Sequence, residues 1–431
     1  MAGSQPWPEE ALGSILRQID AGWSPRCDPQ PAKSGEWGVL KVSAVTWGRY
    51  NPEENKRLVE GLLPRPEIEV KPGDLILSRA NTPELVGRAV LVKYTPPQLL
   101  LSDKLLRLRV DPNRAVADFV NILLGSAQCR MQIEDAATGS SRSMKNISQE
   151  KLRQIVIPVP PLPEQRKIAA ILSSVDDTIE KTQAVIDELQ AVKKAMMQEL
   201  LTRGIPGRHT SFKQTPIGHV PETWAVVPLG EVLSGLDAGW SPQCESEPPQ
   251  EGRWGVLKVS AVTSGVFLPQ ESKALPEGLV PRIEIEVHAG DVLLARANGV
   301  LSLVGRTAYV SSTRPKLMLS DKLLRLRFEE RKANSLYIHF CLQFENIRQQ
   351  LVDRTGGSQM RNISQAALRE VLVPVPSLQE QTMIADAIHS VLKEEEHEVS
   401  YQRELARTKT ALLSLLLTGE IRVTLDPEPC P

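Results

Sequence analysis

Cysteine and aromatic residues are scarce in this 431-residue sequence, and its charges nearly cancel. The five cysteines form no CxxC pair and the six histidines are scattered, so the sequence predicts no metal site. Aromatic residues make up only 4% of the chain, which disfavours a platform that stacks single-stranded bases. No apolar run is long enough to span a bilayer and no signal peptide is recognisable. Isolated cysteines are typical of a reducing compartment, and we expect a cytoplasmic protein.

Catalytic signatures are also missing from the sequence. There is no GxxxxGK[ST] phosphate loop, no HExxH, no GxSxG and no Asn-Pro-Pro-aromatic motif of adenine methyltransferases. The sequence therefore predicts a protein without catalytic activity of its own. With 51 basic and 52 acidic residues, the net charge of −1 neither indicates nor excludes a nucleic-acid partner.

An internal repeat of about 216–218 residues dominates the sequence. The segments that recur in the same order are DAGWSP (20–25 and 237–242), WGVLKVSAVT (37–46 and 254–263), GDLILSRAN and GDVLLARAN (73–81 and 290–298), LSDKLLRLR (101–109 and 319–327), TGSSRSMKNIS and TGGSQMRNIS (138–148 and 355–364), and IVIPVPPLPEQ and VLVPVPSLQEQ (155–165 and 371–381). The chain is a duplicated unit, which we call the first and the second repeat.

Each repeat ends in a long amphipathic stretch. From Ile168 to Leu200, apolar residues recur alternately four and three positions apart, interrupted only by Thr182 and Lys193. This 3.5-residue period is typical of a coiled-coil seam. The second stretch keeps the seam at its ends but carries Glu395, Glu398 and Gln402 in the middle. We predict two antiparallel helices, over roughly 163–202 and 379–418, that bury each other's seams.

The acidic segment 393–398 fits poorly in a sealed seam. Two interpretations stay open for it: a solvated defect of the coil, or a surface that faces solvent or a basic partner. The boundaries that the pattern predicts are a first globular domain (1–162), a long helix (163–204), a linker (205–220), a second globular domain (221–378), a second long helix (379–420) and a C-terminal tail (421–431).

The best candidate binding residues lie at strand ends and in loops. Arg79 and Asn81 close the GDLILSRAN strand, and Arg296 and Asn298 repeat them. Arginine matches a guanine edge and asparagine an adenine edge in the major groove of DNA. Alternatively, these arginines bridge a nearby acid such as Asp74. The loop that follows offers hydroxyl groups beside cations, which suits phosphate or base contact or an ordinary helix cap.

In LSDKLLRLRV, leucines alternate with Arg107 and Arg109, so a strand would turn both arginines to one face; Arg325 and Arg327 repeat this pattern. Such a face is either solvated or neutralises phosphates. Six of the seven tryptophans pair across the repeat, which favours burial, but Trp23 and Trp240 lie in polar GWSP turns and are left out of the predicted core. The predicted DNA-binding residues are Trp23, Ser24, Lys41, Arg79, Asn81, Lys104, Arg107, Ser140, Arg142, Lys145, Trp240, Ser241, Lys258, Arg296, Asn298, Lys322, Arg325, Ser358, Arg361 and Asn362.

This layout resembles the specificity subunit of type I restriction-modification systems. The resemblance rests on GDLILSRAN and GDVLLARAN, on the TGSS and TGGS loops that run into NIS, on the VPxPxLxEQ entries to both helices, and on IGHVPETWAVVPLGEV (217–232). It implies an α+β fold: two similar mixed α/β target-recognition domains, separated by two long antiparallel coiled-coil helices and duplicated about a pseudo-twofold axis. The recognition domains of that family commonly differ strongly, whereas here they are close copies.

The resemblance also implies function and partners. The chain would be a non-catalytic subunit that reads a bipartite site in double-stranded DNA. Its partners would be two modification subunits, which bind S-adenosylmethionine, and restriction subunits, which use ATP and Mg²⁺; this chain itself would hold no cofactor. Alternative functions are a non-catalytic scaffold for protein assembly and a solitary DNA methyltransferase. Because like side chains choose like bases, the two half-sites are predicted to be nearly identical and inverted.

Overall fold

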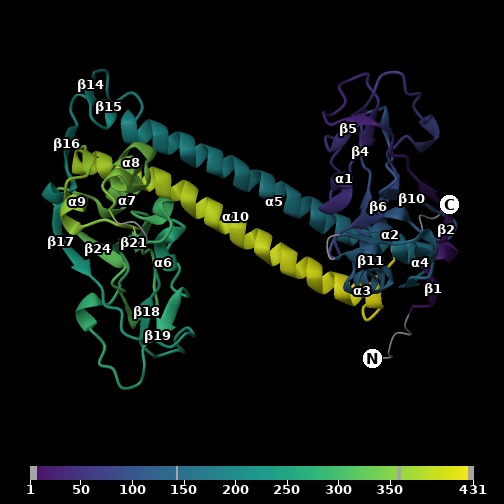
Figure 1. Ribbon diagram of the computed structural model, residues 1–431. Helices are drawn as coiled ribbons and strands as arrows, with labels where there is room; N and C mark the ends of the chain where they lie inside the picture. The colour runs from purple at the N-terminus through teal and green to yellow at the C-terminus, as the bar shows by residue number, and fades with distance from the viewer. Residues whose placement is uncertain (1–6, 142–143, 357–360, 426–431) are drawn as a thin grey trace. The chain divides into compact units, whose positions relative to one another are not determined.

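The alternating leucine segments form the same four-stranded antiparallel sheet in both repeats of the computed structural model, which describes residues 7–141, 144–356 and 361–425 (Figure 1). The strand order is β2-β10-β6-β8 in the first repeat and β17-β24-β20-β22 in the second. The strands of the first repeat are β1 (Glu9–Ala11), β2 (Leu16–Ala21), β3 (Cys27–Asp28), β4 (Gly38–Leu40), β5 (Asn55–Leu58), β6 (Leu75–Ser78), β7 (Ala80–Asn81), β8 (Ala89–Leu91), β9 (Leu99–Leu100), β10 (Leu105–Val110), β11 (Thr138–Ser141), β12 (Met144–Asn146) and β13 (Val156–Pro158).

The second repeat follows the same plan. Its strands are β16 (Ala225–Pro228), β17 (Leu233–Ala238), β18 (Gly255–Leu257), β19 (Ser272–Ala274), β20 (Val292–Ala295), β21 (Ala297–Asn298), β22 (Thr307–Tyr309), β23 (Leu317–Met318), β24 (Leu323–Phe328), β25 (Arg361–Asn362) and β26 (Leu372–Val375), and the hairpin β14 (Phe212–Thr215) and β15 (Gly218–Pro221) lies in the segment before them. The shorter helices are α1 (Ser43–Thr46), α2 (Ala117–Leu124), α3 (Ala127–Ala136) and α4 (Gln149–Arg153) in the first repeat, and α6 (Ser260–Thr263), α7 (Ser335–Gln343), α8 (Glu345–Asp353) and α9 (Gln365–Arg369) in the second.

Each four-stranded sheet is covered on both faces by apolar side chains. On the central strand β10, Leu106 and Leu108 belong to one hydrophobic cluster, together with α2 residues such as Phe119. Leu105 belongs to a second cluster, together with Val39 of the sheet β3-β5-β4-β9. The same division recurs around β24 in the second repeat. The first four residues of each central strand, 105–108 and 323–326, are therefore buried, whereas Arg109 and Arg327 near the strand ends are exposed.

The two long helices are α5 (Leu162–Thr202) and α10 (Leu378–Thr418), which confirms the predicted helices. Each has 41 residues, so at 1.5 Å per residue it is about 60 Å long. The chain divides into two compact units. The first unit contains the described residues up to Gln183 together with those from Tyr401 onward, and the second unit is Ala184–Ser400. Each unit therefore contains one globular part and about half of each long helix. The domain boundaries drawn from the sequence stay a prediction.

Within each unit the two helices pack antiparallel. In the first unit, Ile168 and Leu172 near the start of α5 share a hydrophobic cluster with Leu416 near the end of α10. In the second, Leu200 near the end of α5 shares one with Ile384 and Ile388 near the start of α10. The predicted seams therefore bury each other, and the α+β prediction is confirmed.

Two of the polar residues that interrupt the second seam bond to side chains of α5. Lys193 Nζ of α5 donates to Glu395 Oε2 of α10 at 2.5 Å, and Gln402 Nε2 donates to Gln183 Oε1 at 2.8 Å. Only 13% of the Glu395 side chain is exposed, so its basic partner is a lysine of the same chain. This answers the question that the sequence left open for Glu395.

Candidate nucleic-acid interface

The strand-end arginine and asparagine meet the predicted binding loop on one small sheet. Strand β7 pairs with β12, and β12 pairs with β11, which places Asn81 opposite Lys145. The backbone of Arg79 joins this sheet to a third segment, because its N–H donates to the Lys104 carbonyl and its carbonyl accepts from Ile147. Three separate sequence motifs therefore bring Arg79, Asn81, Lys104 and Lys145 together.

The second repeat assembles the same set of residues. Strand β21 pairs with β25, so Asn298 lies opposite Arg361. The Arg296 N–H donates to the Lys322 carbonyl at 2.8 Å. In addition, Arg296 Nε donates to Asn362 Oδ1 at 3.2 Å, and its two terminal nitrogens have no hydrogen-bond partner within the part of the chain that the structure describes. We call each such set, the strand-end Arg and Asn with the facing cations, a reading cluster.

The GWSP turns border the reading clusters. Gly22 passes so close to the Leu101 carbonyl that a Cβ would lie 2.2 Å from its oxygen, and Trp23 N–H donates to that same carbonyl at 2.9 Å. Ser24 Oγ donates to Asp103, beside Lys104. The half-buried Trp23 and Trp240 are each covered by an arginine, Arg65 and Arg282, with 4.4 Å from the guanidinium carbon to the ring centroid.

A basic hollow lies beside this turn in the second repeat. It has a volume of about 430 Å³, and the predicted residues Ser241, Lys258 and Lys322 line it together with Lys273 and Asp321. Lys258 Nζ is 3.9 Å from Glu271, and the corresponding Lys41 is 3.6 Å from Glu54. Both pairs are partly exposed, so their contribution to stability is small and the lysines stay available for an anionic ligand.

Three predicted residues fall where the structure is not described. Arg142 and Ser358 lie outside the described residues. Ser140 lies in β11, and its side chain is likewise outside them.

The sequence analysis did not single out Lys273, which lines the basic hollow, or Arg65 and Arg282, which cover the two tryptophans. Comparison of the repeats contains the signal for the two arginines, because they match in LLPRPEIE and LVPRIEIE.

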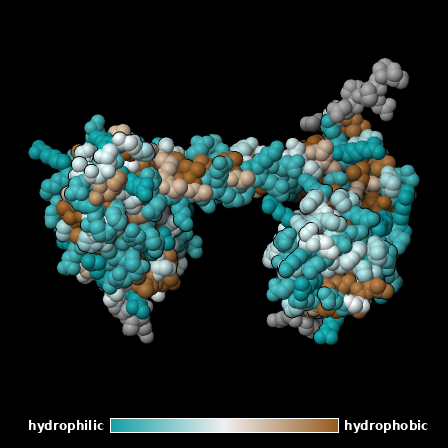
Figure 2. Space-filling view, turned by 90° about the horizontal axis from the view of Figure 1, so that it is seen from above, coloured by the Kyte–Doolittle hydropathy of each residue, from teal (hydrophilic) through white to brown (hydrophobic). Residues whose placement is uncertain are grey.

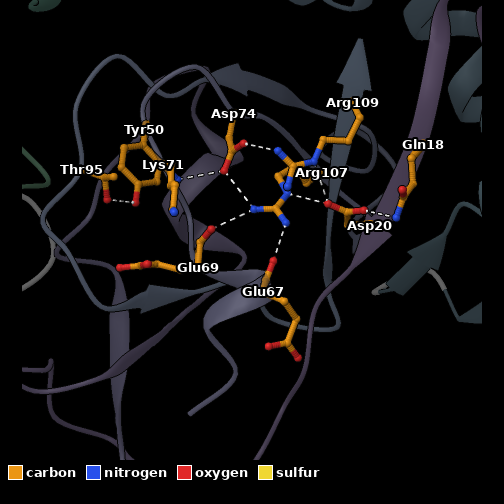
Figure 3. A network of polar contacts seen from close by, with 10 residues as sticks. All are labelled: Gln18, Asp20, Tyr50, Glu67, Glu69, Lys71, Asp74, Thr95, Arg107 and Arg109. Carbon is orange, nitrogen blue, oxygen red and sulfur yellow. Dashed lines mark hydrogen bonds and ion pairs between the residues drawn. The ribbon is translucent and has the colours of Figure 1, made fainter. Parts of the chain in front are cut away.

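Arg107 and Arg325 are not part of the interface, which corrects the prediction from the alternating pattern. Only 2% of the Arg107 side chain is exposed. It donates to Asp20 at 2.8 Å, to Asp74 at 3.1 Å, and to the carbonyls of Glu69 and Glu67 at 2.8 and 2.9 Å (Figure 3). Its strand face is covered by the second hydrophobic cluster rather than by solvent. A buried cation is retained only with such a set of acceptors.

The second repeat contains a corresponding network around a buried arginine. Arg325, 3% exposed, donates to Asp237 at 2.7 Å and to Asp291 at 3.2 Å, and it also donates to the carbonyls of Glu286 and Glu284. Arg327 donates to the same Asp237 at 2.6 Å. Asp74 pairs with Arg107 and Arg109, and no ion pair joins it to Arg79 among the described residues, contrary to the alternative drawn from the sequence.

This network predicts a pH dependence. Burial raises the pKa of Asp237, but hydrogen bonds from Arg327 and Arg325 outweigh it and hold that pKa below its usual value. A carboxylate with a lowered folded-state pKa stabilises the fold above its unfolded-state pKa, and this contribution is lost as the pH falls through the folded-state pKa. We expect the stability difference between the parent chain and Asp237→Asn to shrink as the pH falls below about 4. Urea unfolding at several pH values measures it; a difference that does not change with pH would contradict the assignment.

Comparisons with known proteins agree with this architecture. The model of the type I restriction modification DNA specificity domain matches residues 32–191 and 221–402. The EcoEI specificity subunit of Escherichia coli is 34% identical over 192 residues, which cover 44% of this chain and 32% of that relative. The putative MjaX specificity subunit of Methanocaldococcus jannaschii is 28% identical over 352 residues, 81% of this chain and 79% of the relative. The alignment therefore spans about a third of the first relative and most of the second.

Solved structures share the fold. The type I restriction-modification S subunit from M. genitalium superimposes with a TM-score of 0.62 at 14% identity, covering 97% of both chains. A chain from a structure of a type I R-M system gives a TM-score of 0.50 at 18% identity, covering 98% of this chain and 100% of that one. In the described residues, no helix is long and apolar enough to cross a membrane and no group of metal-ligating side chains is present. Because the family model matches once in each repeat, the chain belongs to the type I restriction modification DNA specificity domain family.

Proposed function

We propose that this chain reads a bipartite site in double-stranded DNA, one half-site with each repeat, as the specificity subunit of a type I restriction-modification complex. The observation that carries the proposal is the reading cluster, which both repeats build from the same three separated motifs. As a member of a DNA specificity family, the chain is a recognition subunit without catalytic activity.

The chemistry of the clusters suits a DNA duplex. Arg79 and Arg296 carry guanidinium groups that match the two acceptors of guanine in the major groove. Lys104 and Lys322 are exposed, and they follow the turns where Ser24 and Ser241 bond to Asp103 and Asp321. Such cations neutralise phosphates and fix the orientation of the protein on DNA, while the base contacts give sequence specificity.

The long helices are the proposed docking surface for two modification subunits, which in turn bring restriction subunits. Apolar side chains such as Val185, Val192 and Tyr401 are exposed along these helices. Figure 2 shows hydrophobic patches between hydrophilic ones along the helix pair. Exposed apolar patches rimmed by polar residues are typical of protein interfaces. In this proposal S-adenosylmethionine, ATP and Mg²⁺ are bound by the partner subunits.

Alanine substitution of the cluster arginines tests the reading role. Arg79→Ala and Arg296→Ala are each expected to cost about 1–3 kcal/mol of discrimination and to relax the preference for one base pair, each in a different half-site. The measurement is sequencing of methylated adenines in cells that express the chain with its modification subunits. Arg331→Ala, which removes an exposed arginine outside the clusters, is the control. A methylation pattern unchanged by both cluster variants would place base reading elsewhere.

The duplication favours half-sites that are nearly identical and inverted. The two clusters share a strand-end arginine and a facing lysine at matching positions, and like side chains choose like bases. The same sequencing of the unmodified parent complex checks this expectation. Two unrelated half-sites would contradict it and leave the specificity role intact. DNA-independent assembly with no sequence preference would instead favour the scaffold function.

A further inference from the structure

The two asparagines of the reading clusters occupy matching positions in the repeated segments, but they differ in their hydrogen bonds. Asn81 is anchored at both ends of its amide. Its Nδ2 donates to Thr46 Oγ1 at 3.1 Å, and its Oδ1 accepts from the Thr82 N–H at 2.9 Å. Thr46 is itself buried, 6% exposed, and its hydroxyl donates to the Val42 carbonyl at 2.8 Å. The Asn81 amide is thus part of the internal structure of the first repeat.

Asn298 is anchored at one end only. Its Oδ1 accepts from the Val300 N–H at 3.0 Å, two residues onward, and its Nδ2 has no partner among the described residues. The corresponding hydroxyl, that of Thr263, forms no hydrogen bond with it in that part of the chain. Asn298 is half-buried at the end of its strand, and its Nδ2 is not among the buried side-chain atoms that lack a partner in the described residues, so the amide N–H₂ is accessible to solvent.

The segment after each asparagine explains the difference. Between Asn81 and Gly87 the chain runs TPELV, whereas between Asn298 and Gly305 it runs GVLSLV, one residue longer. The amide oxygen accepts from the first following residue in the first repeat and from the second in the other, and the second residue after Asn81 is Pro83, which has no N–H to donate. The divergent loop therefore changes the hydrogen bonds of a side chain that the duplication conserved.

We propose that Asn298 reads an adenine in the half-site of the second repeat, and that Asn81 is a structural residue that reads no base. This inference rests on the proposed function. Bidentate reading of adenine needs an amide N–H for N7 and an amide oxygen for the N6 amino group. The Asn298 oxygen keeps one lone pair beside its bond to Val300, and its N–H₂ is unpaired among the described residues. Turning the Asn81 amide N–H₂ toward a base would break its bond to Thr46, whereas its bond from the Thr82 N–H corresponds to the one that Asn298 keeps.

The target is then palindromic except at one position. Arg79 and Arg296 face the same base in their two half-sites. At the neighbouring base pair, only the half-site of the second repeat requires an adenine. This difference between the half-sites arises from hydrogen bonds within the protein. An alignment of GDLILSRAN with GDVLLARAN does not show it, because both segments end in asparagine.

Four variants, each expressed with the modification subunits, test this inference by sequencing of methylated adenines. Asn298→Ala is expected to lose roughly 5- to 150-fold of adenine preference at one position of the half-site that Arg296→Ala also affects. Asn81→Ala is expected to leave base preference unchanged. Thr46→Val keeps the shape of the threonine but releases Asn81 Nδ2, so an adenine preference is expected to emerge in the other half-site. Thr263→Val, its matched control, is expected to change nothing.

The outcomes separate the two proposals. If the parent complex methylates without sequence preference, the proposed function fails. If the parent complex is specific but Asn298→Ala relaxes no position, or Asn81→Ala relaxes the equivalent position equally, the inference on Asn298 is overturned. If Thr46→Val does not change the base preference in the first half-site, the bond to Thr46 is not what keeps Asn81 from reading a base. Circular dichroism of each variant checks that the fold is retained, and Asn298→Ala, which breaks only one internal bond, keeps the test decisive.

Discussion

Replacing Arg107 by methionine is expected to lower the free energy of unfolding by about 3–5 kcal/mol, because it removes the cation from a buried ion-pair network. Asp74 is only 7% exposed and Asp20 12%, so both would lose a charged partner without gaining water. The carbonyls of Glu69 and Glu67 would lose a donor as well. Arg109 still contacts both aspartates, but each loses its buried guanidinium partner and the two carbonyls lose their donor, which costs more than the intact network contributes.

Arg109→Met is the matched control for this prediction. Arg109 contacts the same two aspartates, at 2.9 and 3.2 Å, but 44% of its side chain is exposed. Solvent can replace it, and we expect a loss of about 1 kcal/mol or less. Urea unfolding of both variants measures the difference. The second repeat provides an independent copy, since Arg325→Met should behave like Arg107→Met and Arg327→Met like Arg109→Met. Equal small losses for all four would show that the network is not buried in solution.

The buried arginines also mark the limit of what the sequence could predict. Alternation in LLRLRV correctly predicted a strand and placed Arg107 and Arg109 on one face. It could not show that a second hydrophobic cluster, built from residues 39–105, covers that face. Local patterns report the period of side chains along an element, whereas burial depends on which distant segment packs against it.

The long helices were predicted well because their signal is local and repeated. The expected range of 163–202 compares with Leu162–Thr202, and 379–418 compares with Leu378–Thr418. The seam interruptions were visible too, but their meaning was not. That Lys193 meets Glu395 depends on the register between two helices about 200 residues apart in sequence, which neither helix determines alone.

The reading clusters show the same boundary between local and tertiary information. The sequence picked out Arg79, Asn81 and Lys145 by residue type, and the structure brings them onto one small sheet. Their hydrogen bonds were beyond prediction, because the amide of Asn81 is anchored by Thr46, 35 residues away. Identical motifs can therefore differ in which groups they offer to a ligand.

Proline at Leu189 is expected to disrupt α5 and to cost about 3 kcal/mol or more. Leu189 is a half-buried seam residue in the helix interior, where proline removes a backbone hydrogen bond and clashes with the carbonyl four residues earlier. Beyond it, Leu200 and Leu201 belong to the main core of the second repeat together with Trp224 and Ile384. A break at residue 189 therefore weakens the attachment of this helix end to a whole hydrophobic core.

Leu189→Ala separates the two contributions to this effect. Alanine is the best helix former, so this variant keeps the backbone and loses only part of a half-buried side chain. Thermal unfolding, with capture of the modification subunits as a second readout, should show a large loss for proline and a small one for alanine. The native Pro163 supports this reasoning, because it lies at the second position of α5, where no intrahelical N–H bond is lost. If Leu189→Pro unfolds at the same temperature as Leu189→Ala, α5 is not a continuous helix at that residue.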